Sequence, residues 1–157
     1  MSQFSLDEYS PDERTSVAIG VFDGVHIGHQ AVLQQNLDAA RSAGFRAACL
    51  TFDPHPALVL APAYAPEYIC SLSQRVETML ASSYVDDVVV ATFTLEFARL
   101  SPLEFIERVL VGKLKAGMVC VGADFRYGKG RVGSVMDLEA SGETLGFGVK
   151  IVHAVSD

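Results

Sequence analysis

The sequence has no apolar run that approaches the roughly 20 residues needed for a membrane-spanning helix. Its first ten residues, MSQFSLDEYS, also lack the basic start and the apolar core of a secretory signal. Hydrophobic residues make up 50% of the chain and charged residues 20%, which is close to the usage of globular domains. We therefore expect a folded cytoplasmic protein that makes no contact with a membrane.

Cysteine is scarce, and its spacing excludes the usual cysteine frameworks. Cys49, Cys70 and Cys120 are odd in number and widely separated, and no Cys-x-x-Cys pair is present to hold a metal. Two of the three lie inside apolar runs typical of strands. We therefore expect buried, reduced thiols rather than disulfides or metal ligands.

Basic residues are also few. The 12 Lys and Arg face 19 Asp and Glu, giving a formal net charge of −7, which argues against broad nucleic-acid binding. Any anionic ligand must then be met by a local basic patch. A length of 157 residues predicts one domain, 1–157, in which about residues 1–14 form a loosely held lead-in.

Apolar, β-branched runs alternate with helical patterns along the chain. We expect strands at about residues 15–22, 45–52, 85–93, 117–121 and 147–155. Between them we expect helices at about 28–43, where Val32, Leu33, Leu37 and Ala40 recur at helical spacing, at 71–83, from 101 onward and at 134–145. This order predicts an α/β fold, a Rossmann-like doubly wound parallel sheet of about five strands that binds ligands at the carboxyl ends of the strands.

A glycine-punctuated loop follows the first expected strand. Residues 20–29, GVFDGVHIGH, lead from that strand into the first helix. Backbone N–H groups and the helix dipole at such a junction favour an anion such as phosphate. His26 and His29 lie three positions apart and can donate hydrogen bonds to a triphosphate in a phosphoryl transition state. The alternative is an ordinary turn with two surface histidines, because a bare His-x-Gly-His recurs by chance.

A stiff loop follows the second expected strand. In residues 51–56, TFDPHP, Pro54 and Pro56 enclose His55. Proline fixes its own φ and forces the preceding residue into an extended conformation, so this loop can hold a side chain over a pocket. A rigid surface turn with an exposed histidine is the alternative.

A basic loop follows the fourth expected strand. Residues 121–133, VGADFRYGKGRVG, place Arg126, Lys129 and Arg131 among four glycines. This is the local patch that an anionic ligand requires in an acidic protein. Phe125 and Tyr127 offer flat apolar surfaces for an aromatic ring that carries a phosphate. A merely solvated glycine and lysine loop remains the alternative.

Together, Gly-Val-Phe-Asp-Gly-Val-His-Ile-Gly-His, Thr-Phe-Asp-Pro-His-Pro and Val-Gly-x-Asp-Phe-Arg-Tyr-Gly resemble one known family. This is the FMN adenylyltransferase (FAD synthetase) module of the bacterial bifunctional riboflavin kinase/FAD synthetase family, a nucleotidyltransferase fold of the His-x-Gly-His type. The resemblance covers about residues 15–153, with the three motifs in the family's order. It implies transfer of AMP from ATP to FMN, with Mg²⁺, to give FAD and pyrophosphate.

The resemblance also implies a role for each loop. The residues implied to bind ATP are Gly20, Phe22, Asp23 and Gly24 beside the ribose and adenine, and His26 and His29, the catalytic pair, at the phosphates. The residues implied to bind FMN and phosphate are Pro54, His55, Pro56, Asp124, Phe125, Arg126, Tyr127, Gly128 and Lys129. No protein nucleophile is required, because the FMN phosphate attacks the α-phosphorus in line. The resemblance does not identify the metal ligands.

This sequence departs from the family pattern at its end. The family module continues into a Ser-Ser-Thr-x-x-Arg segment that grips the triphosphate, whereas this sequence stops at residues 155–157, VSD, without that segment or a riboflavin kinase domain. We therefore expect no kinase activity and a folded but poorly active chain.

Two other functions stay open, as does the oligomeric state. One is another adenylyl- or cytidylyltransferase of the same fold, acting on a nicotinate, pantetheine or glycerol phosphate, which the second and third loops disfavour. The other is a flavin- or nucleotide-binding module without turnover.

Overall fold

The computed structural model describes residues 2–20, 27–53, 60, 63, 72–81 and 83–153. In this part of the chain six strands form one sheet in the order β1-β4-β3-β2-β5-β6, and every pairing is parallel. The strands are β1 (Ser2–Ser5), β2 (Thr15–Ile19), β3 (Arg46–Asp53), β4 (Asp87–Thr92), β5 (Ala116–Gly122) and β6 (Gly148–Val152). The helices are α1 (Ile27–Ala43), α3 (Leu72–Ala81), α4 (Leu95–Ala98), α5 (Pro102–Glu104), the π-helical η2 (Phe105–Lys113), the 3-10 turn η3 (Lys129–Arg131) and α6 (Val135–Leu145).

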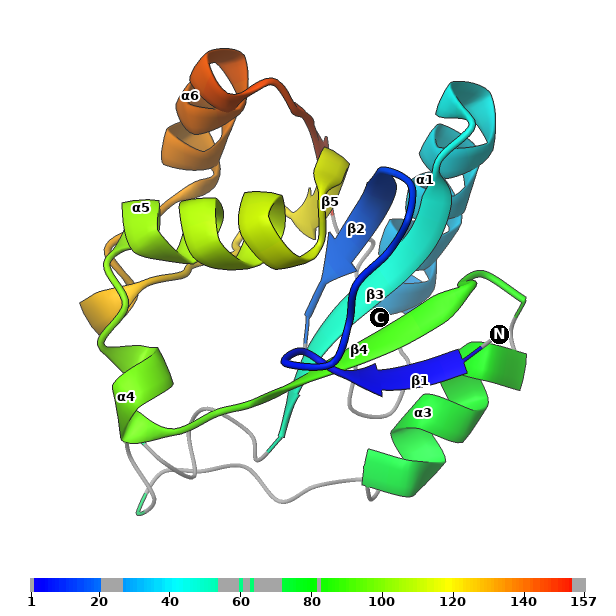
Figure 1. Ribbon diagram of the computed structural model, residues 1–157, viewed down its shortest axis with the longest axis horizontal. Coiled ribbons are helices and arrows are strands. Elements are labelled where there is room, and N and C mark those ends of the chain that lie inside the picture. Colours follow the sequence, from blue (N-terminus) through cyan, green and yellow to red (C-terminus); the bar gives the residue numbers. More distant parts are fainter. Residues whose placement is uncertain are drawn as a thin grey trace.

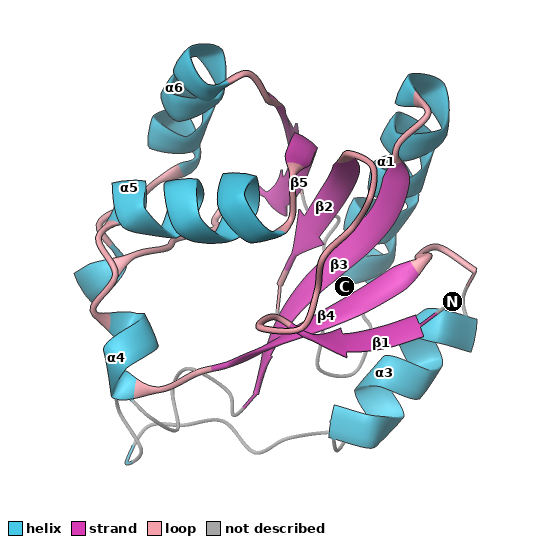
Figure 2. Cartoon of the chain, in the orientation of Figure 1, coloured by secondary structure: helices cyan, strands magenta, loops and turns pink. Residues whose placement is uncertain are grey.

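Helices cover both faces of the sheet, as the alternating pattern predicts. Helices α1 and α3 lie on one side, and α5 with η2 and α6 lie on the other (Figure 1). Figure 2 shows the strands between these two helical layers. A separate apolar core fills each interface, one under η2 and α6 and one under α1 and α3. The predicted doubly wound α/β fold is confirmed.

The central strands consist mostly of apolar residues, and helices cover both of their faces. Every residue of β2 is buried, and so are Val88, Val89 and Val90 of β4. Strands covered by helices on both faces need such continuous apolar runs rather than alternation. This is why the central strands of the sheet could be located from the sequence.

The first residues of the chain differ from the expected loose lead-in. Ser2–Ser5 form the edge strand β1, which pairs with β4 and places Phe4 opposite Val89. The segment that follows β1 is fixed to β4 by Tyr9, whose hydroxyl donates a 2.8 Å hydrogen bond to the buried carboxylate of Asp87. A short polar segment carries little strand signal of its own, and its pairing partner lies far along the chain. The sheet therefore has one strand more than expected.

The helix expected from residue 101 begins as predicted and then widens. The Ser101 hydroxyl accepts from the Glu104 N–H, and the Glu104 carboxylate accepts from the Ser101 N–H, which completes a capping box. From Phe105 the helix is π-helical, and at its end the Leu114 N–H donates to the carbonyl of Val109. The predicted inward stripe of Phe105, Ile106, Val109 and Leu110 is buried.

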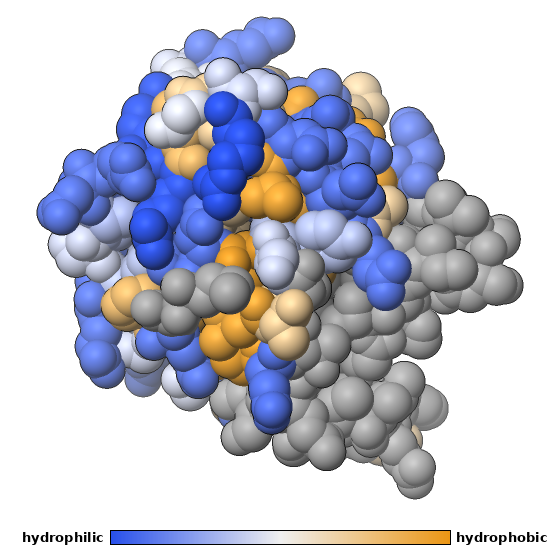
Figure 3. Space-filling model, turned by 90° about the vertical axis from the view of Figure 1, so that its right-hand side faces the viewer, coloured by the Kyte–Doolittle hydropathy of each residue, from blue (hydrophilic) through white to orange (hydrophobic). Residues whose placement is uncertain are grey.

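The burial of the cysteines and the mostly hydrophilic surface are those expected from the composition. Cys49 and Cys120 are buried, as predicted, while Cys70 lies outside the described residues. Among the described helices, none is long and apolar enough to cross a membrane. The side that carries α1 and α3 shows hydrophilic surface broken by a central apolar band (Figure 3).

Candidate functional site

The three loops singled out by the sequence follow three adjacent strands. Strands β3, β2 and β5 are neighbours and run parallel, so their carboxyl ends lie on one edge of the sheet. The chain leaves β2 for α1 on one face and leaves β5 for α6 on the other (Figure 1). The boundary between β2 and β5 is therefore the topological switch point, where folds of this type bind ligands.

Several predicted site residues lie outside the described part of the chain: Phe22, Asp23, Gly24, His26, Pro54, His55 and Pro56. Their placement stays a prediction. The backbone on both sides of the first loop is described. The Gly20 N–H donates to the Leu50 carbonyl at 3.1 Å and extends the pairing of β2 with β3. His29 belongs to the first turn of α1, which starts at Ile27.

The strand register brings the first and third loops together. Ala18 of β2 pairs with Cys120 of β5, so Gly20, two residues further on, stands level with Gly122. The loop after Gly20 leads to His29, and the loop after Gly122 carries Arg126 and Lys129. The strand ends from which the two loops start therefore lie side by side.

The third loop, residues 123–134, is held by its own backbone. The Phe125 N–H donates to the Gly122 carbonyl at 3.1 Å, closing a turn directly after β5. Tyr127 and Gly133 then exchange two backbone hydrogen bonds of 3.2 and 2.9 Å, which close residues 128–132 into a small loop. Arg126 and Lys129 thus project from a backbone with defined partners.

The same loop is docked on the start of α5. The Lys129 N–H donates to the Leu100 carbonyl at 2.7 Å. Gly128 has a φ of 78°, and a Cβ placed on it would lie 2.7 Å from the Pro102 nitrogen. Both the backbone conformation and the close approach require glycine at this position.

Aromatic side chains of the third loop pack against each other and against η2. The Phe125 and Tyr127 rings stack with their centroids 5.6 Å apart. The centroids of the Tyr127 and Phe105 rings are 5.7 Å apart. Only 5% of Tyr127 is exposed, whereas Phe125 is half-buried. Burial raises the pKa of Tyr127 to about 12, and its hydroxyl has no hydrogen-bond partner among the described residues. Phe125 rather than Tyr127 therefore presents ring surface to the solvent.

The predicted basic patch is exposed. Arg126, Lys129 and Arg131 are all at the surface, and within the described part of the chain none of them forms an ion pair. Asp124, at the start of the loop, is also exposed. Because the cations lie close together in the sequence and have no neutralising partner among the described residues, they can attract an anion in an otherwise acidic protein.

Helix α1 differs from α6 at its amino end. At α6 the Asp137 carboxylate accepts from the Ser134 N–H at 3.1 Å, so an acidic side chain already occupies the positive end of that helix. The first turn of α1 contains no acidic residue. Of the two helices that follow β2 and β5, α1 is the one whose own first turn carries no carboxylate.

One buried polar residue was missed by the sequence analysis. In α1 the helical spacing places Leu37 in the apolar stripe, but Leu37 is only half-buried and Asn36 is fully buried. A single amide within a stripe of Val32, Leu33 and Ala40 is a signal that the sequence does contain. Its hydrogen-bond partners depend on tertiary structure and could not be read from the sequence.

The chain is similar to known proteins over most of its length. A family profile described as FAD synthetase matches residues 8–157. A bifunctional riboflavin kinase/FMN adenylyltransferase from Listeria monocytogenes is 41% identical over 135 residues, which cover 85% of this chain and 42% of the relative. The protein of the same name from Escherichia coli K12 is 35% identical over 140 residues, which cover 89% of this chain and 44% of the relative. The one from Pseudomonas fluorescens is 35% identical over 151 residues, covering 96% and 48%. The chain thus spans less than half the length of each of these relatives.

Two solved structures share the architecture. A macrolide-efflux protein from Streptococcus pneumoniae superposes with a TM-score of 0.84 at 25% identity, over 99% of this chain and 51% of that one. A pantoate-beta-alanine ligase from Francisella tularensis, solved with beta-gamma ATP and beta-alanine, superposes with a TM-score of 0.60 at 14% identity, over 96% and 63%. At this level of identity the second likeness concerns the fold alone.

Proposed function

The chain belongs to the FAD synthetase family, and from this premise we propose that it acts as a cytoplasmic FMN adenylyltransferase, which transfers AMP from ATP to FMN and releases FAD and pyrophosphate. One observation carries the proposal. The exposed cations Arg126 and Lys129 follow β5, directly beside the strand whose loop leads to the His-x-Gly-His motif. An ATP at one loop and an FMN at the other would meet at the strand ends.

In this proposal the phosphates of ATP lie at the amino end of α1. The backbone N–H groups of the first turn and the helix dipole attract them there, and no acidic residue in the first turn opposes them. His26 and His29 donate hydrogen bonds to the phosphates. The residues that line the ribose and adenine are Gly20, Phe22, Asp23 and Gly24.

The third loop receives FMN. Arg126 and Lys129 attract its phosphate, and Phe125 offers ring surface to the flavin. Tyr127 supports Phe125 from below, and Gly128 fixes the loop against Pro102. The residues that complete this side are Pro54, His55, Pro56 and Asp124.

The chemistry needs no protein nucleophile. An oxygen of the FMN phosphate attacks the α-phosphorus of ATP, and the bond from that phosphorus to the oxygen bridging it to the β-phosphate breaks. Pyrophosphate leaves with the electron pair. The protein's contribution is to align the two phosphates and to stabilise negative charge through the histidines.

Magnesium would supply further charge neutralisation when bound. Within the described residues, no group of three metal-ligating side chains is close enough to form a protein cage. Mg²⁺ commonly keeps several waters and binds through the phosphates of a substrate. We therefore assign it to the phosphates of ATP and to no specific side chain.

Chromatography of the reaction products tests the proposal. The chain is incubated with FMN and ATP-Mg²⁺, and in parallel with nicotinate, pantetheine and glycerol phosphates as acceptors and with CTP as donor. FAD formed only from FMN and ATP is the expected result. A product from another pair would support the related transferase, and tight binding of FMN and ATP without any product would support a binding module.

A further inference from the structure

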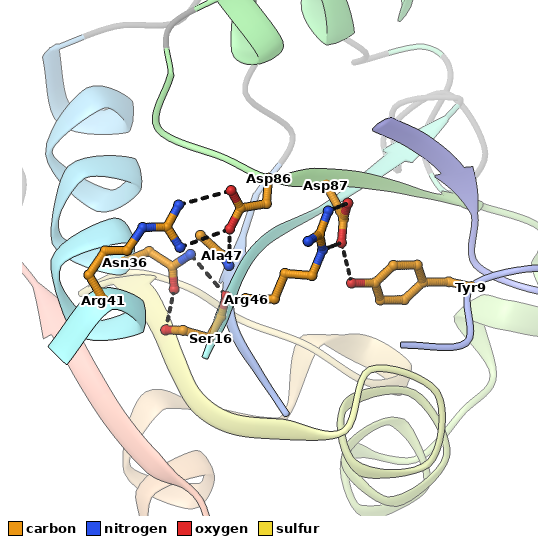
Figure 4. A network of polar contacts seen from close by, with 8 residues as sticks. All are labelled: Tyr9, Ser16, Asn36, Arg41, Arg46, Ala47, Asp86 and Asp87. Atoms are coloured by element: carbon orange, nitrogen blue, oxygen red, sulfur yellow. Dashed lines mark hydrogen bonds and ion pairs between the residues drawn. The ribbon is translucent and has the colours of Figure 1, made fainter. Parts of the chain in front are cut away.

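Asn36 forms a buried polar contact between α1 and the centre of the sheet. Its Oδ1 accepts from the Ser16 hydroxyl at 2.7 Å, and its Nδ2 donates to the Ser16 carbonyl at 3.0 Å and to the Ala48 carbonyl at 3.2 Å. Figure 4 shows the Asn36 side chain directed at Ser16. The side chain is fully buried and uses both of its amide hydrogens. It thus joins α1 to β2 and β3 at once.

These hydrogen bonds restrict α1 in a way that its apolar contacts do not. Val32, Leu33 and Ala40 also face the sheet, but apolar packing is not directional, and the free energy of burial changes little with small sliding or rotation. Hydrogen bonds weaken steeply when their length or angle departs from the optimum. Slipping the helix by one residue would move it by about 1.5 Å and turn it by about 100°, which would break all three bonds.

The position of this contact determines where α1 begins. Ile27, the first residue of α1, lies nine residues before Asn36, which is about 13.5 Å along a helix. Gly20 lies four residues after Ser16, which is about 13 Å along a strand. Because α1 packs antiparallel to β2, the Ser16 contact brings the start of the helix level with the carboxyl end of the strand. Position 29, seven residues before Asn36, lies on the same side of the helix.

We propose that Asn36 is a positioning residue for the ATP phosphates, because it fixes the height and rotation of α1 whose amino end receives them. This inference rests on the proposed function. A misplacement of about 1 Å in a site that works by alignment can cost up to a hundredfold in rate. Asn36 acts through the helix and touches no substrate itself.

Thr15 provides a matched control. It is the neighbour of Ser16 on β2 and is fully buried, and its hydroxyl donates a 2.6 Å hydrogen bond to the Leu114 carbonyl on the opposite face of the sheet. Thr15→Val therefore removes a buried hydrogen bond from side chain to backbone without touching α1. Any loss that follows from destabilisation alone should appear in this variant too.

The experiment compares Asn36→Leu, Ser16→Ala and Thr15→Val with the wild-type chain. For each protein we would measure the melting temperature, the dissociation constants of ATP-Mg²⁺ and FMN by calorimetry, and turnover per folded molecule. Asn36→Leu should weaken ATP binding and lower turnover by about tenfold or more, with FMN affinity within about twofold. Ser16→Ala keeps both amide-donor bonds and should show a smaller loss in the same direction. Thr15→Val should lose thermal stability but keep its ATP affinity.

Equal ATP affinity in Asn36→Leu and Thr15→Val would overturn the proposal, and so would an equal loss of ATP and FMN binding. If Asn36→Leu does not fold, Ser16→Ala decides, and an unchanged ATP affinity in that variant would overturn the proposal. A wild-type chain that binds ATP and FMN but forms no FAD would contradict the proposed function alone. The ATP affinities would then still test the role of Asn36.

Discussion

His29 stands in the first turn of α1, which contains no acidic residue. The N–H groups of a helix's first turn have no partner within the helix, so they can meet an anion. We predict that His29→Ala lowers the turnover of FAD formation on the order of a hundredfold or more, because one donor to the developing charge is lost. The affinity for FMN should change little. Steady-state kinetics and calorimetry would measure both.

Gln34→Ala is the control for this prediction, because Gln34 lies on the exposed side of the same helix. That variant should keep wild-type turnover. Unchanged turnover in His29→Ala would show that His29 does not contribute to catalysis.

Arg126 and Lys129 lie on an exposed, well-anchored loop, so their charge can be removed without disturbing the core. We predict that Arg126→Ala and Lys129→Ala weaken the binding of FMN more than that of riboflavin, which lacks the phosphate. The melting temperature should stay close to that of the wild type. Calorimetry with both flavins would measure the difference.

Arg41→Ala is the matched control for these two variants. It removes one positive charge at the far end of α1, where the guanidinium pairs with Asp86. FMN affinity should be unaffected there. If all three variants bind FMN as the wild type does, the basic loop is a solvated loop that does not bind the phosphate of FMN.

Cys120 is a buried thiol whose titration should be visible in the stability of the fold. Burial raises its pKa from 9.0 to about 11. The thiol therefore stays protonated in the folded state where it would ionise in the unfolded chain, and this contribution is complete below pH 9 and lost as the pH rises through 11. We predict a fall in the free energy of unfolding of roughly 1–3 kcal/mol over this range from this thiol.

Denaturant unfolding at several pH values would measure this effect. Cys120→Ala should be less stable at neutral pH because it leaves a cavity, but its stability should fall less steeply above pH 9. Parallel curves for the two proteins would show that the thiol does not contribute to the alkaline loss.

At the scale of elements, the third loop owes its shape to the start of α5. Gly128 combines a φ of 78° with an approach to Pro102 that leaves no room for a Cβ. We predict that Gly128→Ala displaces the loop and weakens FMN binding, in addition to lowering the free energy of unfolding. Calorimetry and denaturant unfolding would measure the two effects.

Gly146 separates backbone strain from displacement of the loop. It caps α6 with a φ of 89°, and no atom lies within 4 Å of a Cβ built on it. Gly146→Ala should therefore cost about 1–2 kcal/mol from the left-handed conformation alone, with FMN affinity intact. If Gly128→Ala also leaves FMN affinity intact, the docking of the loop does not shape the site.

The elements that the sequence predicted are those whose own residues determine them. Strand β4 could be located from its run of valines, and the start of α5 from Ser101, Pro102 and Glu104. Strand β1 could not, because its pairing with β4 is long-range and its residues are mostly polar. The π-helical course of η2 likewise follows from packing and has no sequence signature that we recognised.

The candidate site was predictable in part for the same reason. The order of strands and helices is enough to place loops at one edge of a parallel sheet, and the basic loop with Arg126 and Lys129 is exposed as expected. The burial of Tyr127 beneath Phe125 depends on Phe105, and the burial of Asn36 depends on Ser16 and Ala48. Contacts between distant segments of this kind are not encoded in local patterns.

At the scale of the whole molecule, the two ends of the sheet differ in their electrostatics. At the amino end, the Arg46 guanidinium donates to the buried Asp87 carboxylate at 2.6 and 2.9 Å, and Tyr9 donates to the same group (Figure 4). Beside it, the Arg41 guanidinium holds the pKa of Asp86 below its usual value. These charges are paired: Arg46 joins β3 to β4, and Arg41 joins α1 to the residue before β4. At the carboxyl end the cations of the third loop have no such partners among the described residues, which is the arrangement expected when the partner is a ligand.

In the proposed reaction, AMP passes from ATP to FMN at this carboxyl edge of the sheet. The most direct test incubates the chain with FMN and with ATP radiolabelled at its α-phosphate, and follows the label by chromatography. We predict that the label appears in FAD, that pyrophosphate is released in equal amount, and that His29→Ala lowers both rates together. Binding of FMN and ATP while all of the label stays in ATP would contradict the proposed transfer. Transfer of the label to a product other than FAD would contradict it too.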